Sequence, residues 1–332
     1  MIRLLPVFAV LAAVASSARA EFKSLDAELS TYEYPFSVSF FETRFKNETL
    51  KMAYMDVPPS APAKPNGKTV VLLHGKNFAG IYWERTIRAL AAEGYRVIVP
   101  DQIGFGKSSK PERIQFSFQL LASWTQALIE KLGAKPYALV GHSMGGMLAT
   151  RMALLYPESV TRLALVNPIG LEDWKTVVPY KPVDELYRKE LAANEESIRN
   201  YQKTAYFGGQ WKPEYDRGIE ALVGWTKHPD YPKVAWNAAL TAEMIFTQPV
   251  YYEFKNLKPR TLLMVGTRDR TAVGKAWADP KVAETLGHYE KLGKQVAKLI
   301  PRSKLVEIPG VGHLPQVEAF DVYWKELSAF LR

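Results

Sequence analysis

The residues best suited to chemistry lie in the pentapeptide Gly141-His142-Ser143-Met144-Gly145. An apolar run over residues 137–140 precedes this G-x-S-x-G pattern, and a helical pattern over residues 144–156 follows it. A strand, a sharp turn bearing a serine and then a helix are typical of a nucleophile elbow. The glycines leave room for the turn, which directs the Ser143 hydroxyl toward free N–H groups and the positive end of the helix dipole. We therefore predict that Ser143 is a catalytic nucleophile.

A serine hydroxyl needs a general base, and that base needs an acid to orient it. His313 is the predicted base, because Pro309-Gly310-Val311-Gly312-His313 follows the last predicted strand, at the sheet edge where catalytic loops gather. His142 adjoins the serine and is expected to point elsewhere, while His74 is expected to hold a loop by hydrogen bonds. No motif surrounds the remaining histidines, His228 and His288.

Asp269 is the predicted orienting acid. It follows the apolar run 261–266, and the chain order Ser143, Asp269, His313 is the order that an elbow of this kind requires. Asp101 is the rival, but it precedes the serine, and its glycine-rich surroundings favour a role in bracing a loop.

An oxyanion hole needs two hydrogen-bond donors. The first predicted donor is the backbone N–H of Met144, directly after the nucleophile. The second is the backbone N–H of Lys76, with Asn77 in reserve, because the small Gly75 lets this loop pass close to the serine. The Lys76 side chain could add positive charge near the substrate, but we expect it to point to solvent.

Predicted strands and helices alternate from residue 69 onward, which indicates a mainly parallel sheet covered on both faces. The predicted strands are 69–73, 96–99, 137–140, 162–167, 261–266 and 304–308. The predicted helices are 82–93, 117–132 with Ser117 as N-cap, 144–156 and 320–331. Strands at 35–41 and 50–57 are expected to form an antiparallel hairpin at one sheet edge.

The alternation stops between residues 168 and 249, a mixed and aromatic stretch. Helical patterns cover 183–205 and 233–246, and no clear strand is present. We predict a helical cap at 168–249, inserted into a core of 21–167 and 250–332, with most aromatic side chains in the interior of the cap. The irregular stretch 274–287 is expected to border the entrance to the site.

Composition describes an ordinary globular protein, with 332 residues, 47% hydrophobic and 23% charged. The net charge of +9 is spread along the chain. It therefore predicts a solvated surface with no nucleic-acid partner, and at most a preference for anionic surroundings or substrates. No cysteine is present, which excludes disulfides and thiolate metal sites, and no cofactor or metal is expected.

Residues 1–20 are expected to be a signal peptide. Arg3 precedes an apolar run over 4–15, and Ala18-Arg19-Ala20 matches a cleavage pattern before Glu21. An uncleaved anchor is the alternative, although the run is short for a membrane span. Cleavage would leave no stable membrane anchor and lower the net charge from +9 to +7, since Arg3 and Arg19 are lost. Without disulfides, a bacterial periplasmic or secreted location is favoured, which would make the sequon at Asn47 incidental.

Together these residues resemble the α/β-hydrolase superfamily over residues 69–331. The motifs that carry the resemblance are His74-Gly75, Asp101-Gln-Ile-Gly-Phe-Gly-Lys-Ser108, Gly141-His-Ser-Met-Gly-Gly146, Asp269 and Gly312-His313. The resemblance implies a mostly parallel eight-stranded sheet with helices on both faces, an inserted helical cap, and acyl-enzyme chemistry without a cofactor. Ser143 stands where the capped dehalogenases and epoxide hydrolases carry Asp, and Met144 differs from the Trp of proline iminopeptidases.

We therefore expect an exported serine hydrolase, a carboxylic ester hydrolase acting on a small or medium ester-like substrate with an apolar acyl or aryl group. Lactonases, perhydrolases and carbon–carbon bond hydrolases share these motifs, and export disfavours the last of them. A ligand receptor that retains the triad, or a scaffold protein, are alternatives from other classes. The oligomeric state is left open.

Overall fold

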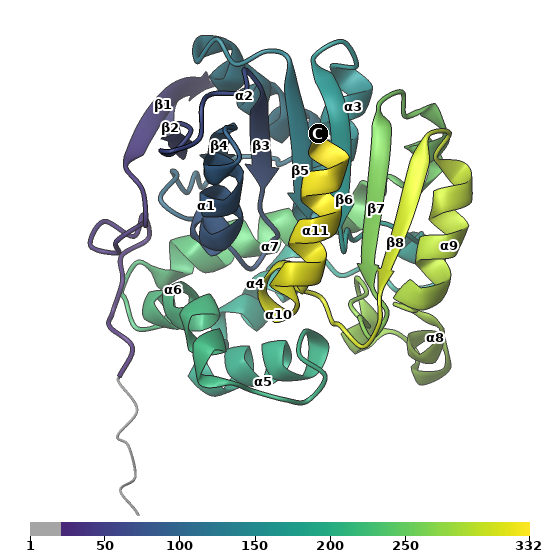
Figure 1. The fold of residues 1–332 in the computed structure, drawn as a ribbon. Helices are drawn as coiled ribbons and strands as arrows, with labels where there is room; N and C mark the ends of the chain where they lie inside the picture. Colours follow the sequence, from purple (N-terminus) through teal and green to yellow (C-terminus); the bar gives the residue numbers. More distant parts are fainter. Residues whose placement is uncertain (1–20) are drawn as a thin grey trace, which may run out of the picture.

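The computed structural model describes residues 21–332, so the signal peptide predicted at 1–20 lies outside the described residues. One eight-stranded sheet runs through the molecule, with the strand order β1-β2-β4-β3-β5-β6-β7-β8 (Figure 1). The strands are β1 (Val38–Phe45), β2 (Glu48–Val57), β3 (Thr69–Leu73), β4 (Arg96–Pro100), β5 (Tyr137–His142), β6 (Val160–Val166), β7 (Arg260–Gly266) and β8 (Ser303–Ile308).

The predicted hairpin forms the β1 edge of the sheet, where β2 pairs antiparallel with both β1 and β4. The other neighbours, in the order β4, β3, β5, β6, β7 and β8, pair in parallel. Strand β1 begins later and runs further than the predicted stretch 35–41. Its pairing reaches Phe45 opposite Glu48, because Lys46 takes a left-handed conformation (φ +52°) that permits a tight turn. Beyond the predicted end at Phe41, Glu42 and Arg44 are exposed to solvent, which an edge strand allows.

The helices cover both faces of the sheet. In the core they are α1 (Glu84–Ala92), α2 (Phe118–Lys131), α3 (Met144–Leu155), α8 (Pro280–Thr285), α9 (Tyr289–Leu299), α10 (Pro315–Glu318) and α11 (Phe320–Leu331). Ser117 caps α2 as predicted, since its hydroxyl oxygen accepts a hydrogen bond from the Leu120 N–H at 3.1 Å. The start of the predicted helix 82–93 is a 3₁₀ turn, Gly80–Trp83.

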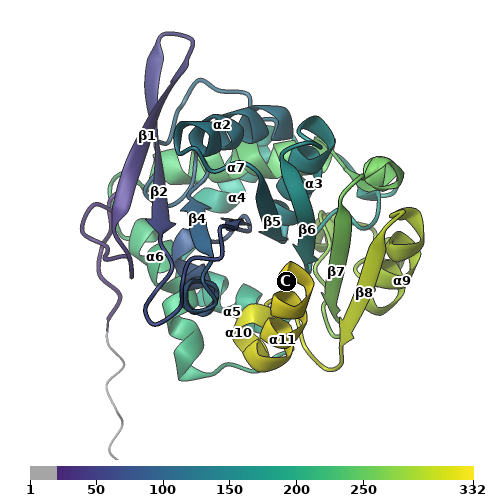
Figure 2. The same ribbon diagram turned by 45° about the horizontal axis from the view of Figure 1, so that its top comes forward.

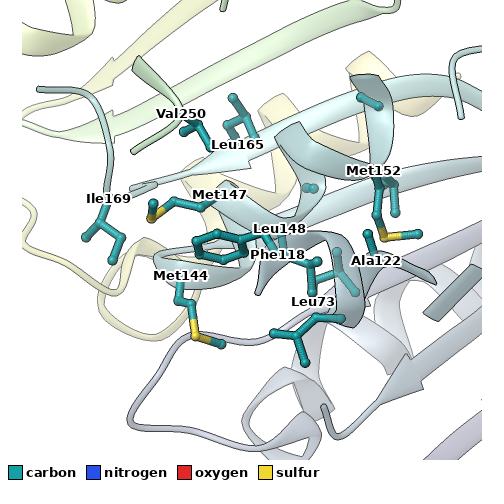
Figure 3. Packing of buried hydrophobic residues seen from close by; sticks show 14 of the residues in the cluster. Leu73, Phe118, Ala122, Met144, Met147, Leu148, Met152, Leu165, Ile169 and Val250 are labelled. Atoms are coloured by element: carbon teal, nitrogen blue, oxygen red, sulfur yellow. The ribbon is translucent and has the colours of Figure 1, made fainter. Parts of the chain in front are cut away.

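Two hydrophobic cores lie on opposite faces of the sheet, because neighbouring residues of a strand point to opposite sides. On β3, Val71 and Leu73 pack with α2, α3 and α9. Val70 and Leu72 pack with α1 and α11. Figure 2 shows α2 and α3 on one side of the sheet and α11 on the other. Figure 3 shows the first core, where Met147 and Leu148 of α3 lie beside Phe118.

Four helices lie between β6 and β7 in the chain: α4 (Val183–Leu191), α5 (Glu195–Ala205), α6 (Asp216–Thr226) and α7 (Tyr231–Thr247). The single helix predicted over 183–205 is wrong. It divides into α4 and α5, since the Asn194 side chain caps α5 in a reciprocal capping box with Ser197. Helix α6 was not predicted, whereas α7 matches the pattern seen at 233–246. These helices cover one end of the sheet (Figure 1).

The segment before β1 packs against the inserted helices. Leu25, Ala27 and Leu29 form a small core with Trp225 and Val234. The Trp225 indole N–H donates to the carbonyl oxygen of Asp26 at 3.0 Å. The segment therefore connects the inserted helices to the edge of the sheet. Over residues 21–332, no helix combines the length and apolar character that a membrane span requires.

Candidate active site

Ser143 occupies the sharp turn between β5 and α3. Its backbone has φ +55° and ψ −121°, a conformation that non-glycine residues rarely adopt. The flanking glycines are required by space, because a Cβ on Gly141 would lie 2.2 Å from the Gly145 carbonyl oxygen. A Cβ on Gly145 would lie 2.2 Å from the Leu73 carbonyl oxygen. The G-x-S-x-G pattern is thus explained by close backbone packing around the serine.

His313 and Asp269 form a fully buried pair, with His313 Nδ1 2.6 Å from Asp269 Oδ2. The backbone N–H of Thr271 donates to the other carboxylate oxygen at 2.8 Å. Because a carboxylate accepts hydrogen bonds, His313 carries its proton on Nδ1. Its Nε2 is then left as a lone-pair acceptor, which is the state that a general base requires.

The second ring nitrogen of His313, Nε2, is buried and bonds to no described residue, Ser143 included. Hydrogen bonds between a nucleophile and its base are often long or poorly aligned before substrate binds. The segments that carry Ser143 and His313 are nevertheless in contact. The Nε2 of His142, next to the serine, lies 2.8 Å from the His313 carbonyl oxygen. The structure therefore brings Asp269 and His313 into direct contact, and Ser143 onto the segment adjoining them.

Asn167 is a residue of this site that the sequence analysis missed. It follows β6 with φ +39°, and its side-chain N–H donates to Asp269 Oδ2 at 2.8 Å. Its Oδ1 accepts from the Gly266 N–H at 3.1 Å. Asn167 thereby connects the ends of β6 and β7 and holds the carboxylate. An asparagine directly after a buried strand, at the edge where the other site residues gather, was the available signal.

Asp101, the rival acid, braces a loop as expected. Its carboxylate accepts hydrogen bonds from the Gly80 N–H, the Lys107 N–H and the Tyr34 hydroxyl, at 2.6, 2.8 and 2.7 Å respectively. His74 also braces a loop as expected, because its Nε2 accepts a hydrogen bond from the Gln102 N–H at 3.0 Å. Burial lowers the pKa of His74.

His142 takes part in a buried chain of hydrogen bonds. Its Nε2 must donate to the His313 carbonyl, so its Nδ1 accepts from the Tyr82 hydroxyl at 2.9 Å. The Tyr82 oxygen in turn accepts from the Gly75 N–H at 3.3 Å. Burial, together with repulsion from His313, lowers the pKa of His142 far below its usual value. His142 therefore stays neutral at neutral pH and links the two loops that flank the serine.

The two predicted oxyanion donors belong to the two segments that flank Ser143. Met144 is the first residue of α3, where backbone N–H groups lack helical partners. The loop after β3 comes close as well, since a Cβ on Gly75 would lie 3.0 Å from Ser143 Cβ. The Lys76 N–H in that loop bonds to no described residue. The Lys76 side chain does not simply extend into solvent as expected, because it forms an ion pair with Glu190 of α4 at 2.9 Å.

Tyr206, at the end of α5, covers the catalytic histidine candidate. Its ring stacks on His313 with centroids 4.7 Å apart, and its carbonyl oxygen accepts from the His313 N–H at 3.3 Å. Its hydroxyl accepts from the Asn77 side-chain N–H at 2.9 Å. Sequence alone placed Tyr206 only among the aromatic residues of the predicted cap.

A cavity of about 540 Å³ opens beside Ser143. Most of its lining is apolar and comes from the inserted helices, including Leu186, Ile198, Val234, Ala238, Ile245 and Phe246. The stretch 274–277 borders it, although part of the irregular stretch predicted at 274–287 is in fact helix α8. The cavity is large enough for a small or medium organic molecule.

Residues 68–320 match the family described as alpha/beta hydrolase fold, and the chain belongs to this family. A solved structure of a probable hydrolytic enzyme from Pseudomonas aeruginosa PAO1 is 48% identical, with a TM-score of 0.91, covering 94% of this chain and 99% of that one. Among curated proteins, Lipase 1 of Psychrobacter immobilis is 27% identical over 80% of this chain and 77% of its own length. A haloalkane dehalogenase of Mycobacterium marinum is 28% identical over 62% of this chain and 72% of its own. The chain is thus a hydrolase of the α/β family.

Proposed function

We propose that this protein is an exported serine hydrolase that cleaves a small or medium carboxylic ester through an acyl-enzyme on Ser143. The observation that carries the proposal is the buried His313–Asp269 pair, whose free Nε2 belongs to the segment adjoining the strained serine turn. An apolar cavity beside the serine supports an apolar acyl or aryl group in the substrate.

In the proposed mechanism, His313 Nε2 takes the hydroxyl proton as Ser143 Oγ attacks the ester carbonyl. The backbone N–H groups of Lys76 and Met144 receive the negative oxygen of the tetrahedral intermediate. His313 then protonates the leaving alcohol, and a water molecule, activated by the same nitrogen, releases the acid. Asp269 holds the imidazole in the required tautomer and stabilises its positive charge.

The serine favours acyl transfer over dehalogenation, although one relative is named a haloalkane dehalogenase. If Ser143 displaced a halide from an alkyl carbon, the product would be an ether on the protein, which has no carbonyl for water to attack. A carboxylate nucleophile leaves an ester that water can cleave. Release of halide from haloalkanes by the purified protein would contradict this part of the proposal.

The export in this proposal rests on Arg3, the apolar run 4–15 and Ala18-Arg19-Ala20. Expression of the full chain in a bacterium, followed by fractionation and mass measurement, tests it directly. We expect a periplasmic or secreted product that begins at Glu21. A cytoplasmic product of full mass would contradict export and leave the chemistry untouched.

Hydrolysis of p-nitrophenyl esters from acetate to long acyl chains tests the chemistry, with Ser143→Ala as the comparison. We expect turnover to peak at one acyl length and to fall by at least about 10⁴-fold in the variant. Labelling by a fluorophosphonate should occur in the wild type only. Equal turnover in both proteins would exclude Ser143 as the nucleophile, and labelling without turnover would direct the search toward amides, lactones or a receptor role.

A further inference from the structure

The lining of the cavity carries positive charge. Among the residues that line it, four are lysines, Lys76, Lys181, Lys189 and Lys275, and the single acid is Glu190. Glu190 is already paired with Lys76 at 2.9 Å. The lining of this otherwise apolar cavity therefore has an excess of positive charge that its own carboxylate does not neutralise.

Two of these lysines lie around one indole ring. The ammonium nitrogen of Lys181 is 5.8 Å, and that of Lys189 5.3 Å, from the centre of the Trp277 ring. The Trp277 N–H donates to the Pro179 carbonyl oxygen at 3.0 Å, which ties the stretch 274–277 to the segment that precedes α4. A flat ring held by its edge keeps the two cations near the same end of the cavity.

These cations differ in how they are balanced. Lys181 forms an ion pair with Glu185 at 3.2 Å. Exposed ion pairs of this kind contribute little to stability. Lys189 forms no ion pair within the described part of the chain. Lys189 is an exposed residue, yet desolvation of its ammonium lowers the pKa of Lys189, and repulsion from Lys76 and Lys181 lowers it further against the attraction of Glu190. An anion placed beside Lys189 would relieve this repulsion.

We propose that the preferred substrate is an ester with an anionic group, such as a carboxylate, at the far end of an apolar chain. The reacting carbonyl lies at Ser143, the chain lies along the apolar lining, and Lys181 and Lys189 receive the anion beside Trp277. This inference rests on the proposed function, because it assumes an ester bond at Ser143. It adds a specificity that the apolar cavity alone does not predict.

The test compares two substrates of equal acyl length, mono-p-nitrophenyl adipate and p-nitrophenyl hexanoate. The measured quantity is the ratio of their kcat/KM values. We expect the wild type to favour the adipate, and the double variant Lys181→Gln/Lys189→Gln to lower the ratio about tenfold. Raising sodium chloride from about 0.05 to about 0.5 M should lower the wild-type ratio, since salt screens exposed charges. Lys233→Gln is the matched control, because Lys233 is an exposed lysine of α7 that does not line the cavity.

A binding measurement separates the two proposals. Calorimetry on Ser143→Ala, with monomethyl adipate and dimethyl adipate, reports recognition of the anion without turnover. Tighter binding of the monoester that is lost on adding Lys181→Gln/Lys189→Gln supports the inference. It does so even if no ester is hydrolysed, because absence of hydrolysis counts against the proposed function alone. Hydrolysis of both esters with a ratio that the double variant leaves unchanged would overturn this inference while the proposed function stands. Equal binding of the two adipates would overturn it as well.

Discussion

The ring of Tyr206 stacks on the ring of His313, with the two planes inclined at only 26°. Tyr206 belongs to the inserted helices and His313 to a loop after the last strand, so this contact joins the two parts of the molecule at the candidate base. The Tyr206 carbonyl oxygen also accepts the His313 N–H, at 3.3 Å. The inserted helices thus hold the histidine as well as lining the cavity.

Replacing this ring should affect catalysis more than replacing its hydroxyl. Tyr206→Ala removes the stacking surface, so we expect kcat for p-nitrophenyl esters to fall at least about tenfold through misplacement of His313. Tyr206→Phe keeps the ring and loses the hydroxyl's hydrogen bonds with Asn77 and Tyr201, so its loss of kcat should be smaller. Equal losses in the two variants would show that the hydroxyl, not the stack, is what matters.

Asn167 is expected to act as a positioning residue for Asp269. Asn167→Ala leaves the Gly266 N–H unpaired and removes one hydrogen bond from a buried carboxylate, which should lower the free energy of unfolding by about 1–3 kcal/mol. It should also lower kcat. Asn237→Ala is the matched control, because Asn237 is equally buried and bonds only to backbone carbonyls away from the pair. If Asn167→Ala loses stability but lowers kcat no more than Asn237→Ala does, the positioning role is excluded.

Acid should destabilise the protein through its buried neutral histidines. The folded-state pKa of His142 is far below its ordinary value near 6.5, so below that pH the unfolded chain binds a proton that the folded chain does not. The stability that this group contributes is complete above about pH 6.5 and is lost as the pH falls, at up to about 1.4 kcal/mol per pH unit. Urea unfolding from pH 7.5 to 4.5 should show a shallower decline in His142→Gln, and identical slopes would contradict the assignment.

Alkali should have the opposite effect through Lys110. Burial lowers its pKa to about 7, although its ammonium donates to the carbonyl oxygens of Gly106 and Ser108. Between about pH 7 and the ordinary lysine pKa near 10.5, the unfolded chain binds the extra proton, so stability should rise with pH by up to about 1.4 kcal/mol per unit. Lys110→Met should remove this rise between pH 7 and 9.5. A rise of equal size in the variant would show that other groups cause it.

Much of the α/β part of this protein could be predicted from sequence. Strand β3 and helix α11 have the predicted bounds, and the strand–serine–helix order around Ser143 is as expected, because each depends on a local pattern of apolar residues and glycines. The mainly parallel sheet follows from the alternation of such patterns. The roles of Ser143, Asp269 and His313 in catalysis stay predictions for the experiments above.

Tertiary structure alone decided the rest, because it depends on contacts between residues far apart in the chain. The stack of Tyr206 on His313 and the hold of Asn167 on Asp269 join segments about 100 residues apart or more. No periodicity in a single segment encodes such contacts. The ion pair of Lys76 with Glu190 has the same origin. The sequence predicts that the Lys76 side chain points to solvent, and Glu190 comes within reach only when the inserted helices pack over the serine. The local sequence determined which residues could carry the chemistry, and packing of the inserted helices decided what surrounds them.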